Sequence, residues 1–253
     1  MNKQRIKKAI WLVLLTGVTV VTLIAARFQA DALVEGLEVE IVSVEKGHHL
    51  ITPEEFVAMI TEKFGPVKGL PPDMLDMRSM ENWLQTHPYV RQADVYLGST
   101  GTLVLRVHQR MPLLRIVDNN GKHWYIDTDT VRMPVARQLS ARVPLVNGDF
   151  PATEDMSKWN TAMLMELGNE LWDDDFMRLM IDQVYIERPD RIWLVPRLGP
   201  SRILLGDLSD LAGKMERIET FYKKALPPAG WDTYAYIDAR FAGQIVAKKR
   251  MNL

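Results

Sequence analysis

The first 26 residues constrain this chain most, because their pattern is typical of a membrane anchor. The run 10–26 contains 17 residues without a charge, close to the shortest helix that spans ~30 Å of hydrocarbon. The preceding residues contain no acid and four cations: Lys3, Arg5, Lys7 and Lys8. Positive charge resists translocation, so we predict a cytoplasmic tail at 1–8 and a single transmembrane helix at 9–28. The remainder of the chain should lie on the far side of the membrane.

A cleavable signal peptide is the alternative, since Ala30-Asp31-Ala32 offers a small-x-small cleavage site after the apolar run. The run is longer than the usual apolar core of a signal peptide, which has about 7 to 15 residues. We therefore favour a retained anchor, followed by a short stalk at 29–36. Both interpretations export the body of the protein.

The composition of the exported part argues against some classes of function. Removing the four tail cations from the 31 Lys and Arg leaves 27, against 32 Asp and Glu. This mildly acidic balance does not favour nucleic acid, which requires a concentrated basic face. The chain has no cysteine, so its core depends on packing without disulfides, and thiolate chemistry is excluded.

The segment 37–110 predicts the order β-α-α-β-β. Alternating apolar residues in LEVEIVSVE indicate a half-buried strand, and Thr52 with Glu55 forms a capping-box pattern at a helix start. Asp76 is placed to cap a second helix. Two strands should follow around a turn at 98–101, and the second should bury Leu103, Leu105 and Val107 on one face.

From 111 to 253 the pattern predicts a larger mixed sheet with helices interposed. An Asn-Gly pair at 120–121 is typical of a hairpin turn. Helices are expected from Ser157 to Leu171 and from Ser209 to the Pro227-Pro228 pair. The expected strands are 113–117, 123–127, 184–187, 192–195, 202–205, 234–239 and 244–248. The predicted fold class is α+β.

No catalytic pattern emerges from the sequence. The histidines show no H-E-x-x-H spacing, and His48-His49 is more simply a solvated turn than a metal site. The segment 206–214 has the wrong spacing for a phosphate-binding loop and fits a helix start. Asp173 to Asp175 should be a solvated turn after a helix. We predict no enzyme activity, metal or cofactor; an exported, membrane-anchored enzyme is the alternative.

Five segments, in the same order along the chain, resemble the FtsQ/DivIB divisome family. They are 84–95, 103–112, 120–127, 144–148 and, with its Asp-x-Arg pattern, 237–246. The chain departs from the family in its very short cytoplasmic tail and in Gln109-Arg110, where many members have Glu-Arg.

The resemblance implies a fold and a function. It implies a POTRA domain at 37–110 and a C-terminal β domain at 111–253. It also implies a non-catalytic, single-pass scaffold of the inner membrane that recruits FtsB/FtsL-type proteins to the division septum, without a small-molecule substrate. A POTRA-bearing transport or outer-membrane assembly factor is an alternative, disfavoured because such chains continue into a long β-barrel.

The resemblance also places the main partner site in the last strand, where a segment of FtsB would add to the sheet edge. The final strand of a chain is often an edge, which offers unpaired N–H and C=O groups. Apolar side chains there would anchor the partner, cations would pair with its carboxylates, and a glycine would permit close approach. The alternative is a closing strand whose basic end only deters aggregation. The predicted residues are Arg240, Phe241, Ala242, Gly243, Gln244, Ile245, Val246 and Lys248.

Overall fold

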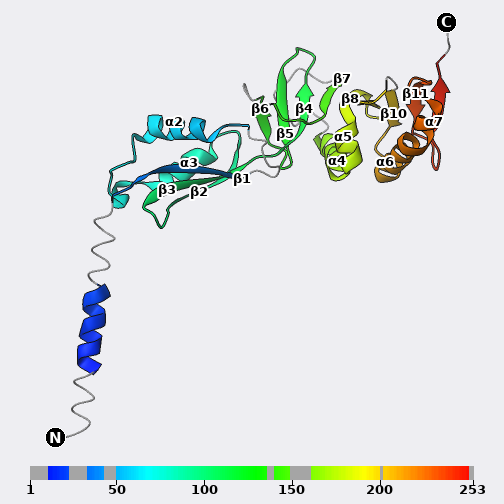
Figure 1. Cartoon of the computed structure of the whole chain (residues 1–253). Helices are drawn as coiled ribbons and strands as arrows, with labels where there is room; N and C mark the ends of the chain where they lie inside the picture. Colours follow the sequence, from blue (N-terminus) through cyan, green and yellow to red (C-terminus); the bar gives the residue numbers. More distant parts are fainter. Residues whose placement is uncertain are drawn as a thin grey trace. The chain divides into compact units, whose positions relative to one another are not determined.

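The computed structural model describes six stretches of the chain, which are shown with their elements in Figure 1. The chain folds as two compact units. The first unit comprises Met1–Val42 with Ile51–Gln109, and the second comprises Ser43–Leu50 with Arg110–Leu253. The described residues are 11–22, 33–42, 50–135, 140–148, 161–199 and 202–250.

Residues 11–22 are helical. Three threonine hydroxyls on this helix donate to carbonyls one turn earlier, as Thr19 does to Leu15 O. Among the residues described, no helix has both the length and the apolar character needed to cross a membrane. The rest of the predicted 9–28 anchor, the tail at 1–8 and 29–32 of the stalk lie outside the described residues.

The first unit has one three-stranded sheet with two α-helices. The strand order is β1-β3-β2, in which β1 runs parallel to β3 and β2 runs antiparallel to it. Along the chain its elements are β1 (Gly36–Val42), α2 (Pro53–Phe64), the 3-10 turn η1 (Pro72–Met74), α3 (Met77–Gln85), β2 (Val90–Leu97) and β3 (Thr102–Gln109).

Local signals in the sequence account for both helices of the first unit. The capping box is confirmed, since the Thr52 side chain accepts the N–H of Glu55 while the Glu55 carboxylate accepts the N–H of Thr52. Asp76 caps α3 by accepting the N–H of Ser79. The predicted apolar face of β3 is also confirmed, because its inward side chains Leu103, Leu105 and Val107 are fully buried.

Packing in the first unit extends before the predicted start of the domain. Val34, in the segment assigned to a stalk, is 1% exposed and belongs to the core. Its N–H donates to Leu70 O, and its carbonyl accepts the N–H of Gly69. The chain is therefore fastened to the loop between α2 and α3 before β1 begins.

The second unit is built on one mixed, nine-stranded sheet. The strand order is β12-β11-β10-β9-β8-β7-β4-β5-β6. Its strands are β4 (Pro112–Val117), β5 (His123–Asp127), β6 (Arg132–Pro134), β7 (Leu145–Gly148), β8 (Ile181–Arg188), β9 (Arg191–Pro196), β10 (Arg202–Gly206), β11 (Tyr234–Asp238) and β12 (Val246–Lys249). Its helical segments are α4 (Thr161–Asp173), α5 (Asp175–Met180), α6 (Leu211–Thr220), the π-helical turn η3 (Phe221–Ala225) and α7 (Leu226–Ala229).

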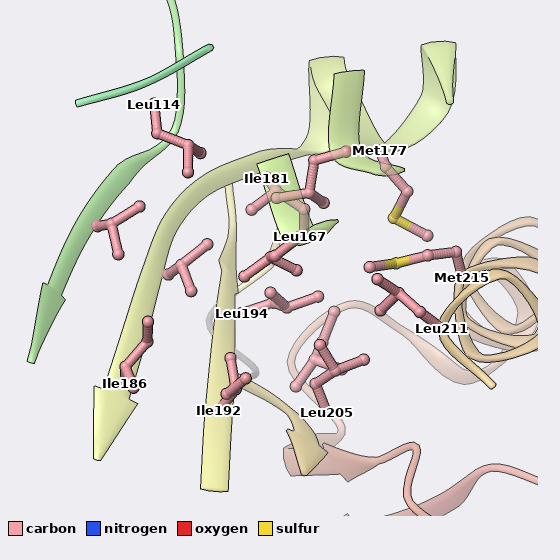
Figure 2. Packing of buried hydrophobic residues seen from close by; sticks show 14 of the residues in the cluster. Leu114, Leu167, Met177, Ile181, Ile186, Ile192, Leu194, Leu205, Leu211 and Met215 are labelled. Carbon is pink, nitrogen blue, oxygen red and sulfur yellow. The ribbon is translucent and has the colours of Figure 1, made fainter. Parts of the chain in front are cut away.

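The core of the second unit joins the helices to one face of the sheet. Figure 2 shows Met177 of α5 and Met215 of α6 converging near Leu167 of α4, beside strand residues such as Leu194. All four side chains are at most 1% exposed. The flexible methionines fill the space between helices that meet from different parts of the chain.

The last long helix differs from its prediction at both ends. It begins at Leu211 rather than at Ser209, after Asp210, which adopts a left-handed φ of 49°. The Pro227-Pro228 pair does not end the helical segment, because both prolines lie in the first turn of α7. Proline is tolerated in the first turn of a helix, so α7 can begin with this pair.

Three other expectations changed or fell outside the described residues. The 118–121 turn is present, but only Gly121 of the Asn-Gly pair has a positive φ, at 75°. Within Asp173–Asp175, Asp174 accepts the N–H of Met177 and caps the unpredicted helix α5. Ser157, His48 and His49 lie outside the described residues.

Candidate partner-binding edge

Strand β12 forms one end of the nine-stranded sheet and pairs only with β11 among the described strands. Arg250 extends this antiparallel ladder by donating its N–H to Thr233 O. N–H groups of successive strand residues point to opposite sides. The N–H groups of Val246 and Lys248 should therefore face β11, and those of Ala247 and Lys249 should face away from the sheet.

The candidate site is a turn followed by a strand, which corrects the predicted strand at 244–248. Residues 241–243 form a bend and turn, with Gly243 at φ 72°, and the strand begins only at Val246. A left-handed glycine is suited to this turn, because side chains are disfavoured there. No atom lies within 4 Å of a Cβ built on Gly243, so its surroundings are open.

Arg240 is held by Asp238 within the chain. Its Nε and Nη2 atoms lie 2.9 and 2.7 Å from the two Asp238 carboxylate oxygens, and its backbone N–H also donates to Asp238. Burial alone would raise the pKa of Asp238, but the hydrogen bonds and charge of Arg240 outweigh it and lower the pKa. The predicted partner cation Arg240 therefore already has a carboxylate partner.

Gly206 makes this arrangement possible from a distant part of the chain. It ends β10 with φ 82°, and a Cβ there would lie 2.6 Å from Arg240 Cγ. Next to Arg240, Ala239 is fully buried and donates its N–H to Leu204 O. The Asp-x-Arg segment thus fastens the end of β11 to β10.

The apolar residues of the candidate site differ in their exposure to solvent. Phe241 and Val246 are 44% and 43% exposed, whereas Ile245 is partly buried and packs against the core. Ile245 also lines a groove of about 500 Å³ together with Phe221 and Thr220 of the helical segment. Phe241 and Val246 are therefore the accessible apolar contacts.

The aromatic residues beside β12 are functional candidates that the sequence did not indicate. Lys248 Nζ lies 5.9 Å from the ring centroid of Tyr236, which in turn meets Trp193 edge-on at 6.1 Å. Tyr236 and Lys248 are register partners on β11 and β12, so their side chains share one face of the sheet. The alternation in YAYID indicates a strand with Tyr236 on one face, but its contact with Trp193 depends on the order of strands in the sheet.

The buried charged side chains in the described part of the second unit have hydrogen-bond or ion-pair partners within the chain. Asp127 is 1% exposed and bound by Arg110 at 2.8 Å, while Asp118 accepts backbone N–H groups of its own turn. Lys214 is bound by Asp207, and Asp238 by Arg240. We assign no catalytic role to these groups. Across the described residues, no three His, Asp or Glu side chains gather as metal ligands.

Comparison with known proteins finds a family match within the second unit. Residues 111–248, more than half of the chain, match the family model described as FtsQ/DivIB, C-terminal related. The chain belongs to the FtsQ/DivIB family. The matched region runs from β4 into β12, so it includes the candidate edge of this FtsQ/DivIB protein.

Two curated relatives carry the name Cell division protein FtsQ. The chain is 29% identical over 182 residues to the protein of Rhodothermus marinus, covering 69% of this chain and 66% of the relative. It is 26% identical over 172 residues to the protein of Salinibacter ruber, covering 65% and 66%. The matches thus span just under two thirds of the length of each relative.

Proposed function

We propose that this FtsQ/DivIB protein is a non-catalytic, single-pass scaffold of the bacterial divisome. In this role it recruits FtsB/FtsL-type membrane proteins to the division septum through its exported body. Support comes from the family membership and from relatives named for cell division. The observation that carries the proposal is the position of β12, a basic strand at the end of the large sheet.

The proposal divides the chain by task. Residues 9–28 anchor it in the inner membrane with the tail 1–8 in the cytoplasm, and the stalk predicted at 29–36 ends before Val34, which already packs in the core of the first unit. Residues 37–110 form a POTRA domain, for which the observed order β1-α2-α3-β2-β3 is the support. Residues 111–253 form the C-terminal domain that receives the partner.

A partner strand would bind by extending the sheet at β12. Main-chain hydrogen bonds to the outward groups of Ala247 and Lys249 would supply affinity, as in other cases of strand addition. Exposed Phe241 and Val246 would supply apolar contacts, and Lys248 would favour a partner carboxylate. Arg240 would mainly hold the preceding turn in place through Asp238.

The experiment is a binding measurement between the full-length protein in detergent and the FtsB-type protein of the same organism. Ala247→Pro removes an outward donor and places a ring on the edge, so we expect affinity to fall about tenfold or more. Phe241→Ala should weaken binding by removing an exposed anchor. Lys248→Glu should also weaken it, whereas Lys68→Glu, the same charge change in the first unit, should not.

Circular dichroism and thermal unfolding must show that each variant remains folded. Folded Ala247→Pro and Phe241→Ala variants that bind the FtsB-type protein like the wild type would show that the site is wrongly assigned. Family membership would stand in that case, because it rests on residues 111–248 as a whole.

The proposed location has a separate test. A reporter that is active only outside the cytoplasm should be active when fused after Leu253, and a cytoplasmic reporter should be active when fused before Lys3. A mature protein that begins at Leu33 would mean that the anchor is removed by cleavage after Ala30-Asp31-Ala32.

A further inference from the structure

The two edge strands of the three-stranded sheet in the first unit differ in whether a helix binds their outer backbone groups. At the β2 edge, the N–H of Val95 donates to the Glu81 carboxylate at 2.8 Å. On the same strand, the carbonyl of Ala93 accepts the Gln85 side-chain amide at 3.4 Å. Glu81 and Gln85 both belong to α3, so this helix occupies backbone groups that another strand would need.

The β1 edge has no such cover among the described residues. β1 pairs with β3 on one side, and the sheet order places no strand on its other side. A parallel strand directs alternate N–H and C=O groups away from its partner. β1 thus presents several unpaired backbone groups over its seven residues.

The side chains of β1 show that the core is incompletely covered at this edge. Leu37, Val39 and Ile41 face the core but remain half-buried. Their register partners on β3 are Leu103, Leu105 and Val107, and each of these is fully buried. An additional strand beside β1 would bury the apolar surface that remains exposed at alternate positions.

The opposite face of β1 is acidic. Glu38 and Glu40 are exposed there, Glu35 precedes the strand, and 33–42 contains no Lys or Arg. Arg106 pairs with Glu40 at 2.9 Å, which leaves the segment with a net negative charge. Opposite charges on neighbouring strands attract, so this face favours a basic strand.

We propose that the β1 edge is a second strand-addition site, which accepts an extended protein segment with alternating apolar and basic residues. The apolar residues pack beside Leu37, Val39 and Ile41, and the basic residues lie beside Glu38. β2 is not used, because α3 already occupies its edge. This site lies on the first unit and does not depend on the partner assigned to β12.

The probe is a capped nine-residue peptide in which valine and lysine alternate, added to the full-length protein in detergent. Hydrogen exchange should slow at Gly36–Val42 and remain unchanged at Val90–Leu97 and Val246–Lys249. A peptide of alternating valine and glutamate should not bind. Glu38→Lys should weaken binding about three- to tenfold, whereas Glu62→Lys on the exposed face of α2 should leave it within about twofold.

A double variant tests the role of α3. Glu81→Ala with Gln85→Ala frees the β2 edge, so the valine-lysine peptide should then also slow exchange in Val90–Leu97. The proposal is wrong if the wild-type protein does not bind this peptide, or if protection appears at β2 or β12 and not at β1. Equal binding by Glu38→Lys and the wild type would also overturn it.

Discussion

At the residue scale, the buried Lys214 side chain is held by hydrogen bonds to a single residue, Asp207. It is 3% exposed, and its Nζ donates to the Asp207 carboxylate at 2.8 Å and to the Asp207 carbonyl at 2.9 Å. The hydrogen bond from Lys214, assisted by one from Ser209, lowers the pKa of Asp207 to about 2. This pair ties the end of β10 to the first turns of α6.

The first prediction concerns pH. Because the folded-state pKa of Asp207 is depressed, its contribution to stability is present above its ordinary pKa of 3.8 and is lost as pH falls toward about 2. We expect Asp207→Asn to destabilise the second unit near neutral pH by roughly 1 kcal/mol, since the Asp207 carboxylate is exposed. Urea unfolding at pH 7, 4 and 2 checks this. The variant should lose less stability than the wild type between pH 4 and 2, and parallel losses would contradict the assignment.

At the element scale, strand ends are fastened by contacts between segments distant in sequence. The end of β10 at Gly206 accepts Arg240 from the turn after β11, and Ala239 bonds back to β10. Helix starts behave differently, because Thr52 and Asp76 cap their helices through neighbours three residues away. These two caps were therefore predictable from the sequence, whereas the contacts between β10 and the end of β11 were not.

The second prediction tests the contacts between β10 and Arg240 with two glycines of similar φ. Gly121 has φ 75° and open space where a Cβ would lie, whereas a Cβ on Gly206 at φ 82° would displace Arg240. Gly121→Ala should cost about 1–2 kcal/mol from left-handed strain alone. Gly206→Ala should cost about 1 kcal/mol more, since Arg240 must move from Asp238. Urea unfolding compares them, and equal costs would mean that the Arg240 contact contributes little.

At the scale of the whole molecule, the two units have separate hydrophobic cores. The core of the first unit includes Leu105, the core of the second includes Leu167, and the two clusters share no residue. Each unit should therefore lose stability independently when its own core is damaged.

The third prediction is that Leu105→Ala destabilises the first unit by roughly 2–5 kcal/mol and leaves the second unchanged. Val104→Ala, on the opposite face of β3, should cost less because Val104 is only half-buried. Leu167→Ala should act on the second unit alone. Hydrogen exchange followed separately in β3 and β8 measures this. A similar loss of protection in both units after either core substitution would show that they unfold together.

Features that depend on near neighbours could be predicted from the amino-acid sequence. Alternating residues predicted the buried face of β3, and Thr52 and Asp76 predicted the starts of α2 and α3, because these signals act within a few residues. The strand predicted at 244–248 begins two residues later, at Val246, and Ile245 before it packs against the core.

Which strands lie at the sheet edges, and which neighbours surround Arg240, followed from the three-dimensional fold. β1 and β3 are separated by two helices and a strand, yet they pair in parallel, and this leaves the β1 edge open while α3 covers β2. Asp238 and Arg240 are only two residues apart, but the room for the Arg240 side chain depends on Gly206 from a distant part of the chain. These strand pairings and side-chain surroundings depend on contacts between segments distant in sequence, so local propensity cannot predict them.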